Sequence, residues 1–350
     1  TYLSRAFHPA LGFMAGWVSV FAGFAGPIAA AALALESYLA TALGAAPPAG
    51  ATGAAVIALA AFLHAIRPSL GVGSLTGLVV LKAALLVGFL LWGAARVEIA
   101  APATPAPFDL GAFAVTLVWV SFSFSGWNGA VYLAGEIREP ERNLRRALWM
   151  PTVGVAVLYL GANALFLYAG SGAELAGRAD IGAAAARLLG GPTAERIVAA
   201  IVALALVTSI SVMVLSGPRV LAQMARDGML PKVLARGRAA PTAAIAFQAV
   251  IAIGIVFVSD LRQLIGTLGY TLGLSAAVTV AAAVWLRSRE GATRVPMPGY
   301  PLVPAIFIGF TLWSSAFLVV RNPADALTGS ILLGLGLPAY LVARLRRPPA

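Results

Sequence analysis

The sequence predicts an all-α polytopic membrane protein that forms a single domain over residues 1–350. Of its 350 residues, 60% are hydrophobic and 11% are charged, whereas soluble globular proteins average about 45–50% apolar and about 25% charged residues. The apolar residues gather in ten stretches, each close to the roughly 17–25 residues that a helix needs to cross a bilayer. Both observations favour a chain that crosses a lipid bilayer many times.

The predicted spans follow one another along the whole chain, and the second is short for a span. Their approximate bounds are 10–35, 51–66, 72–95, 110–134, 147–169, 196–216, 241–258, 262–286, 301–320 and 327–343. Residues 100–108 are rich in proline and predict an external connection. Residues 173–190 predict a longer external loop in which Ile181, Ala184 and Leu188 are spaced for an interfacial helix.

Positive charge is divided unevenly between the two sets of alternate connections. One set holds 17 of the 24 Lys and Arg residues and the other holds six, while Lys82 lies inside a span. Because cytoplasmic loops are enriched in Lys and Arg, the richer side is predicted to be cytoplasmic, with both ends of this chain on it, in a cell membrane. This topology accounts for the net charge of +11, so we expect no nucleic-acid partner.

The residue types on which most enzymes depend are scarce. Cysteine is absent and histidine occurs twice, which leaves little material for a thiolate nucleophile, a zinc centre or a Ser-His triad. No phosphate-binding loop of the type G-x-x-x-x-G-K-[ST] occurs. Inside the spans only Lys82 and Glu36 are ionisable candidates for chemistry. We therefore expect no enzymatic activity, no cofactor and no metal site.

The fourth span contains polar and small residues in the middle of an apolar segment. Residues 118–130 read VWVSFSFSGWNGA. Glycine is costly inside a helix, and serine side chains compete for backbone hydrogen bonds, so a helix is expected to open here. Two interpretations follow from these residues alone. Broken helices at membrane depth border cavities and mark transporter sites, whereas small residues also allow helices to pack closely.

Three motifs flank this span or follow it. They are GEIREPERNLRRAL at 135–148, GPRVLAQMARDGMLP at 217–231 and PGYPLVP at 298–304. Together with residues 122–128, the first closely resembles the sixth helix and following loop of the amino acid–polyamine–organocation (APC) permeases, above all the L-type and serine/threonine exchangers. The second resembles the loop after the family's eighth helix, and the third resembles the start of its eleventh. The matches occur in family order and cover essentially the whole chain.

The resemblance implies a LeuT-like inverted-repeat fold. Permeases of this family have twelve helices, of which the first ten form two inverted five-helix repeats. About ten are present here, because residues 10–35 match the third helix. The first two helices, which include the Gly-rich break that holds the substrate carboxylate, have no counterpart in residues 1–350. We therefore expect coding sequence for two further helices upstream.

The resemblance also implies a substrate site. Phe122 matches the family's aromatic gate, and Asn128 matches a side chain near the substrate. The residues that match the unwound turn, where free carbonyl groups accept from an ammonium group, are Ser123, Phe124, Ser125 and Gly126. The residues expected to line the opposite wall are Gly23, Gly26 and Pro27. Since Ser125 and Asn128 are polar but uncharged, they favour a neutral amino acid as the substrate.

Lys82 is the second candidate for function. It lies near the middle of the third span, where a charged side chain costs about 2.5–3.5 kcal/mol on insertion scales, and a central position makes snorkelling to the interface difficult. In the resemblance Lys82 matches a fifth-helix lysine that takes the place of a sodium ion, with Thr208 and Ser209 as hydroxyl partners. Such a lysine either couples transport to H⁺ or acts as a fixed cation in a sodium-independent exchanger.

These features predict a secondary transporter of amino acids that works by alternating access, as an H⁺ symporter or an exchanger. The alternative is a non-transporting membrane subunit, a sensor or an inactive fragment of a permease. The sequence leaves open which amino acid is carried and whether a partner subunit is needed.

Overall fold

The computed structural model describes residue 3 and residues 7–46, 48–66, 72–97, 107–127, 139–170, 172–237, 241–293 and 295–345, without the side chains of 72–76, 127, 140, 141 and 173. Within these ranges all regular secondary structure is helical. Seven described helices are long and apolar enough to cross a membrane, and three more are apolar but shorter. These features confirm the predicted all-α polytopic fold class.

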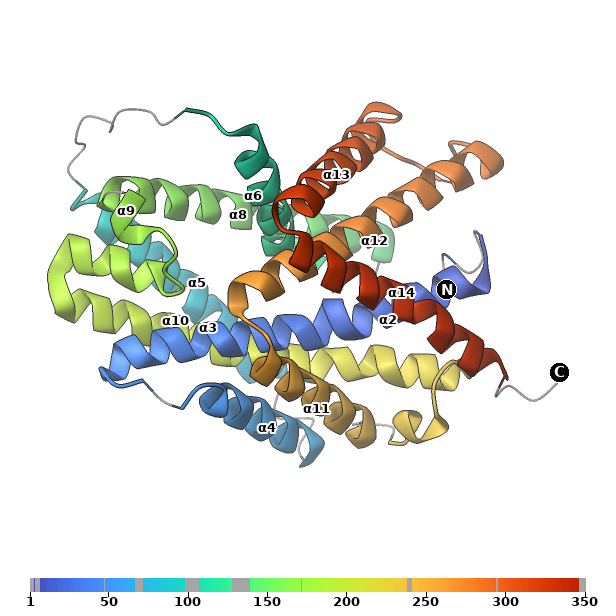
Figure 1. The fold of residues 1–350 in the computed structure, drawn as a ribbon, viewed down its shortest axis with the longest axis horizontal. Coiled ribbons are helices and arrows are strands. Elements are labelled where there is room, and N and C mark those ends of the chain that lie inside the picture. The colour runs from blue at the N-terminus through green and yellow to red at the C-terminus, as the bar shows by residue number, and fades with distance from the viewer. Residues whose placement is uncertain are drawn as a thin grey trace.

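The helices are arranged as shown in Figure 1. In chain order they are α2 (Pro9–Val18), the π-helical segment η1 (Ser19–Ala25), α3 (Gly26–Leu43), α4 (Ala51–Ile66), α5 (Val72–Ala94), α6 (Leu110–Ser123), the 3₁₀ segment η3 (Ser125–Trp127), α8 (Pro140–Ala169), α9 (Gly172–Leu175), α10 (Ile181–Arg226), the 3₁₀ segment η5 (Lys232–Ala235), α11 (Thr242–Val258), α12 (Leu261–Glu290), α13 (Leu302–Arg321) and α14 (Pro323–Leu345).

All ten apolar stretches are helical over most of their described residues: the first is divided among α2, η1 and α3, the fourth contains α6 and η3, and several helices extend beyond their stretch. The helix α8 begins at Pro140, ahead of the stretch at 147–169, and α10 continues to Arg226. Non-helical backbone at Gly190 and Gly191 divides α10 into a short first part and a long second part. The division of the chain into ten membrane spans stays a prediction.

The main core surrounds α3, which packs against α10, α4 and α11 (Figure 1). Alanine supplies much of this core, and several of these alanines are completely buried. They include Ala22, Ala25, Ala29, Ala32, Ala199 and Ala252. Small side chains allow helix backbones to approach closely, and this is how helices associate where lipid removes much of the hydrophobic driving force. Larger side chains such as Leu35, Ile57 and Ile210 fill the spaces between them.

A second group of helices, α6, α12, α13 and α14, packs beside this core. The helix α6 approaches α12 closely at Gly269, which faces the backbone of Val118. At the edge of the molecule, α5 and α8 expose most of their apolar side chains, as helices that face lipid are expected to do.

Candidate functional site

The first helix is interrupted near its middle by the π-helical segment η1. The amide of Gly26 donates to the carbonyl oxygen of Phe21, five residues earlier. Pro27 lies in the first turn of α3, and because proline has no amide hydrogen it cannot complete the α-helical bond to the Gly23 carbonyl. The wide turn therefore occurs where the sequence prevents a regular one, and π-helical turns often occur at functional sites.

The three residues of the predicted wall lie at this interruption but differ in their surroundings. Gly26 is buried, and a methyl group on its Cα would lie 2.5 Å from Cδ2 of Leu268 on α12. Gly23 and Pro27 are half-buried. A methyl group on Gly23 would find its nearest neighbour, Cβ of Ser19, at 3.8 Å. Gly26 thus serves close packing, whereas Gly23 has space beside it.

The second interruption lies at the end of α6. The α-helix ends at Ser123, Phe124 has φ −97° and ψ 5°, and a 3₁₀ segment follows over Ser125–Trp127. The run of serine and glycine thus ends the α-helix inside the apolar segment, as the sequence predicts. Asn128 lies outside the described residues.

The side chains at this interruption make contacts in two directions. Phe122 is half-buried and packs against the main core, which includes Ala22 and Ala25 of η1. On the other side, Tyr159 of α8 donates from its hydroxyl to the Ser123 carbonyl at 3.0 Å.

The ring of Phe124 meets Tyr159 edge-on at 5.1 Å. Ser125 is half-buried and Gly126 is exposed. The end of α6 therefore lies between the main core and α8.

Lys82 and its two predicted hydroxyl partners are brought together between α5 and α10. The Lys82 ammonium donates to Oγ of Ser209 at 3.3 Å, and Ser209 in turn donates to the Ala205 carbonyl at 2.9 Å. Thr208 is buried and donates to the same carbonyl at 2.8 Å. The side chains of Lys82 and Thr208 line one pocket.

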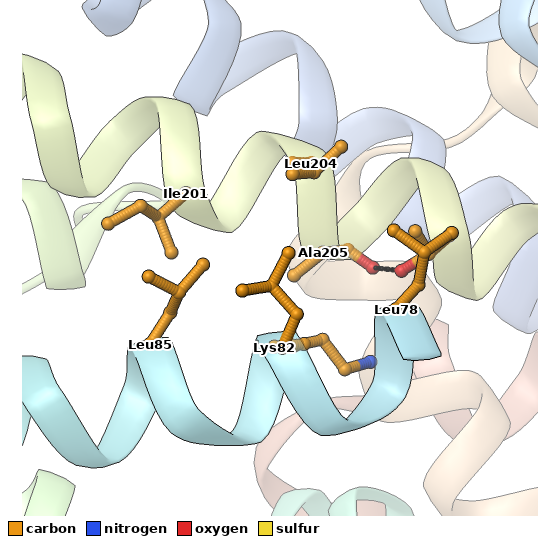
Figure 2. Close-up of a pocket in the computed structure, with 8 residues that line it drawn as sticks. Leu78, Lys82, Leu85, Ile201, Leu204 and Ala205 are labelled. Atoms are coloured by element: carbon orange, nitrogen blue, oxygen red, sulfur yellow. Dashed lines mark hydrogen bonds between the residues drawn. The ribbon is translucent and has the colours of Figure 1, made fainter. Parts of the chain in front are cut away.

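Apolar side chains make up most of the lining of this pocket (Figure 2). The other lining residues are Leu78, Leu81, Leu85, Ile201, Leu204 and Ala205. A cation in such surroundings is costly unless a polar group receives it, and here the Ser209 hydroxyl does so. Within the described part of the chain, Lys82 is a cation with one hydrogen-bond acceptor, the Ser209 hydroxyl, and its charge is sensitive to a proton or an incoming anion.

Two residues differ from what the sequence indicates. From its place in the sequence, at the end of a short apolar stretch beside Arg67, His64 is expected to be a loop or interface residue, and this expectation is wrong. Its side chain is buried with 7% exposure, and Nε2 lies 2.8 Å from Oγ of Ser211 on α10. Glu36 reads as a residue solvated at the interface. Its carboxylate instead accepts from the amides of Gly50 and Gly53 at 2.9 Å each, at the start of α4.

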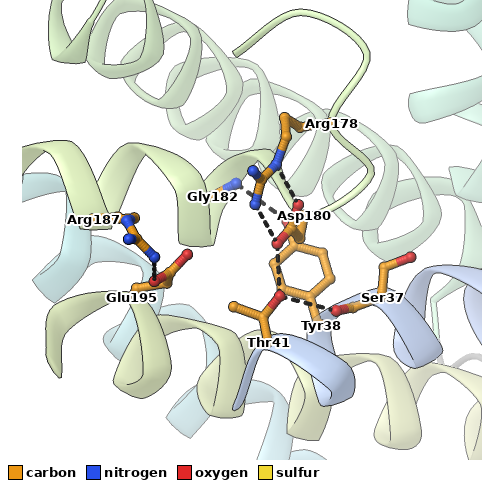
Figure 3. Close-up of polar contacts among 8 residues, drawn as sticks. All are labelled: Ser37, Tyr38, Thr41, Arg178, Asp180, Gly182, Arg187 and Glu195. Atoms are coloured by element: carbon orange, nitrogen blue, oxygen red, sulfur yellow. Dashed lines mark hydrogen bonds and ion pairs between the residues drawn. The ribbon is translucent and has the colours of Figure 1, made fainter. Parts of the chain in front are cut away.

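A polar cluster joins α3 to the start of α10 (Figure 3). Asp180 accepts from the Arg178 guanidinium at 2.9 and 3.0 Å and from the Thr41 hydroxyl at 2.7 Å. Burial alone would raise the pKa of Asp180, but the hydrogen bonds from Arg178 and Thr41 hold it below its ordinary value. Beside it, Arg187 bridges to Glu195 at 2.8 Å across the Gly190–Gly191 kink.

The described side chains offer little for a metal ion. Within the ranges given above, no three His, Cys, Asp or Glu side chains lie close enough together to hold one. The polar groups at the two helix interruptions are backbone carbonyls, amides and hydroxyls, which suit an organic ligand with an ammonium or carboxylate group.

The chain is similar to known membrane transport proteins. A family profile described as "Amino acid permease" matches residues 1–333. Large neutral amino acids transporter small subunit 2 of Homo sapiens is 28% identical over 237 residues, which are 67% of this chain and 44% of that protein. Asc-type amino acid transporter 1 of Mus musculus is 27% identical over 238 residues, 67% of this chain and 44% of that protein. The matched segment thus spans less than half the length of these relatives.

Proposed function

Because this chain belongs to the amino acid permease family, we propose that it works in secondary transport of amino acids by alternating access. The observation that carries the proposal is the end of α6 at Ser123, where a 3₁₀ segment replaces the α-helix inside an apolar segment. Backbone carbonyls near such a break are available to a substrate. The protein is a multi-pass membrane protein, and we place it in the cell membrane with both ends of this chain cytoplasmic because of its charge distribution.

The proposed substrate site lies at the two interruptions. Phe122 closes it as a flat apolar gate, and Asn128 contributes a polar side chain. The residues of the unwound turn proposed to surround the substrate ammonium are Ser123, Phe124, Ser125 and Gly126, and the Ser123 carbonyl is shared with the Tyr159 hydroxyl. The residues of the opposite wall are Gly23, Gly26 and Pro27. A neutral amino acid is the proposed substrate, since the polar groups at α6 are uncharged and a relative at 28% identity is named for large neutral amino acids.

Lys82, Thr208 and Ser209 form the proposed coupling site. In an H⁺ symporter, Lys82 releases its proton when the pocket closes and loses water. In a sodium-independent exchanger, the ammonium stays charged and replaces a bound cation throughout the cycle. The contact between Lys82 and Ser209 supports both alternatives, and transport measurements separate them.

Counterflow in proteoliposomes tests the proposal. The full-length protein is reconstituted without sodium and offered a panel of labelled amino acids, with and without an inward proton gradient. We expect counterflow of neutral amino acids, and Phe122→Ala should reduce it at least tenfold. Phe310→Ala is the control, because Phe310 is an exposed aromatic residue on α13. Stimulation of net uptake by the gradient indicates symport, and exchange indifferent to it indicates an exchanger.

A matched pair of serines tests the coupling site. Ser209 and Ser216 both donate to a carbonyl four residues earlier on α10, but it is Ser209 that accepts from Lys82. Lys82→Met and Ser209→Ala should both change uptake or its pH dependence, whereas Ser216→Ala should not. Equal behaviour of the two serine variants would refute the assignment.

The alternative of a non-transporting subunit has its own signature. One relative is named a small subunit, so a role within a larger assembly is a specific second candidate. Amino acids that raise the thermal midpoint of the purified protein without any counterflow would favour this alternative over a working carrier. Absence of both effects for every amino acid would overturn the substrate class.

A further inference from the structure

His64 is a buried ionisable side chain that the proposed transport site does not use. It lies in the last turn of α4, a helix that packs against α3, α10 and α11. Its side chain is 7% exposed, and Nε2 lies 2.8 Å from Oγ of Ser211. The direction of this hydrogen bond depends on where the imidazole carries its hydrogen: Nε2 accepts from the hydroxyl in the neutral Nδ1–H tautomer and donates in the Nε2–H tautomer and in imidazolium.

The partner hydroxyl differs from the others on the same part of α10. Thr208, Ser209 and Ser216 each donate to a carbonyl of their own helix, three or four residues earlier. Ser211 instead faces His64. Its hydroxyl can therefore reorient when the protonation of the imidazole changes, whereas the other three hydroxyls are hydrogen-bonded to backbone carbonyls.

The position of Ser211 also links His64 to the Lys82 pocket. Ser209 accepts from Lys82 of α5, and Ser211 contacts His64 of α4. Two residues along an α-helix turn through about 200°, so these two hydroxyls point to opposite sides of α10. The same turn of α10 is therefore held between two ionisable side chains from different helices.

Among the described residues, the helices packed around His64 carry their charged groups on α3 and α10. On α3, Glu36 binds the amides of Gly50 and Gly53 at the opposite end of α4. On α10, Arg219 is exposed and lies eight residues beyond Ser211. The helix α11 carries no charged residue, and Arg67, which follows His64 in sequence, lies outside the described residues. Among the described residues, the polar groups placed to stabilise a charged imidazole are thus those of Ser211, its hydroxyl and its backbone.

We propose that His64 is a proton-binding site, and that its protonation reverses the hydrogen bond with Ser211. In the neutral tautomer with hydrogen on Nδ1, Nε2 accepts from the Ser211 hydroxyl. When a proton from water binds Nε2, the new N–H bond donates to Oγ of Ser211, and the hydroxyl hydrogen turns to the Val207 carbonyl of its own helix. Such bonds from a serine to its own helix bend it slightly, two residues from the hydroxyl that receives Lys82.

The binding of the proton can be tested without any transport assay. The chain has two histidines, so the variant His8→Asn leaves one, and asparagine retains the capping function of His8 at the start of α2. Protein with this change, in which any histidine outside residues 1–350 is also replaced, is labelled with ¹⁵N-histidine, placed in nanodiscs and titrated by NMR. We expect His64 to pass from a neutral tautomer to imidazolium as the pH is lowered.

Two serine variants make the test specific. Ser211→Ala should shift the titration midpoint by about half a pH unit or more, and the matched variant Ser216→Ala should leave it unchanged. An imidazole that keeps one protonation state across the titrated pH range would overturn the proposal. A titration midpoint that Ser211→Ala does not move would also overturn it. These spectra use a chain that retains His64, so the test does not depend on the folding of a His64 variant.

The consequence for transport rests on the proposed function. His64→Gln should retain uptake but flatten its pH dependence around the NMR midpoint, and a pH profile identical to that of the wild type would refute the link. The two proposals can be refuted independently. Titration of His64 without any amino acid transport would support the proton site and overturn the transport function. Amino acid transport with a His64 that does not titrate would support the transport function and overturn the proton site.

Discussion

Replacing Gly269 of α12 by alanine tests the contact that places the end of α6. An alanine Cβ at this position would lie 2.6 Å from the carbonyl oxygen of Val118 and 2.8 Å from its Cγ1. A backbone carbonyl cannot rotate away, so α6 must move by several tenths of an ångström. Overpacking of this kind costs about 1–3 kcal/mol.

The gain in helix propensity from the exchange opposes this cost. Glycine in a helix is less stable than alanine by roughly 0.5–1 kcal/mol, so a control with the same gain is needed. Gly273, one turn later on α12, provides it, because an added methyl group there would meet Cγ2 of Thr311 at an ordinary 3.5 Å. Gly269→Ala should therefore be less stable than Gly273→Ala by about 1–3 kcal/mol.

The measurement is the midpoint of thermal unfolding of both variants in the same nanodiscs, followed by tryptophan fluorescence. Gly269→Ala should unfold several degrees below Gly273→Ala. Phe122 lies one helical turn after Val118, so Gly269→Ala should also weaken substrate binding while Gly273→Ala should not. Equal midpoints, or the reverse order, would show that α6 and α12 do not approach in this way.

Three further predictions concern polar contacts outside the transport site. Asp180→Asn should lower the thermal midpoint by the equivalent of about 1–3 kcal/mol. The pKa of Asp180 is lowered in the fold, so its contribution to stability is complete above about pH 4 and is lost as the pH falls below that value. The wild type should therefore lose stability on acidification more steeply than the variant. Glu36→Ala should cost a similar amount because the amides of Gly50 and Gly53 lose their acceptor, and hydrogen exchange of both amides should become faster. Unchanged exchange would contradict this contact. Arg321→Gln should change stability by less than about 1 kcal/mol, because both side chains of its ion pair with Asp109 are about half exposed at 51% and 47%; a loss as large as that of Asp180→Asn would refute this.

Most of the fold can be predicted from the sequence because its signals are local. A run of apolar residues long enough to cross a bilayer is visible without knowledge of its neighbours, and each of the ten runs contains a helix. The end of the α-helix at Ser123 is also predictable, since serine and glycine weaken the helix at that point. Helix ends are less predictable. Charged residues such as those of 141–146 continue α8 beyond its apolar part, because Glu and Arg favour helix in water.

The surroundings of individual polar side chains could not be predicted in the same way. The burial of His64 depends on α10, whose Ser211 lies 147 residues away in sequence, and no local pattern around His64 indicates this contact. The partners of Glu36 could not be predicted for the same reason, since they are amides that come within reach only because α4 begins beside Glu36. The Ser209 partner of Lys82 lies 127 residues away and was expected from the family resemblance alone.

The π-helical segment Ser19–Ala25 has a consequence for how this helix can change in length. A π turn holds about one residue more than an α turn, so the segment stores an extra residue within a helix that runs from Pro9 to Leu43. Loss of one residue there would convert it to α-helix and leave both flanks facing the same neighbours. A deletion elsewhere in the helix would rotate one buried face by about 100°. Single-residue gaps between relatives should therefore fall inside this segment.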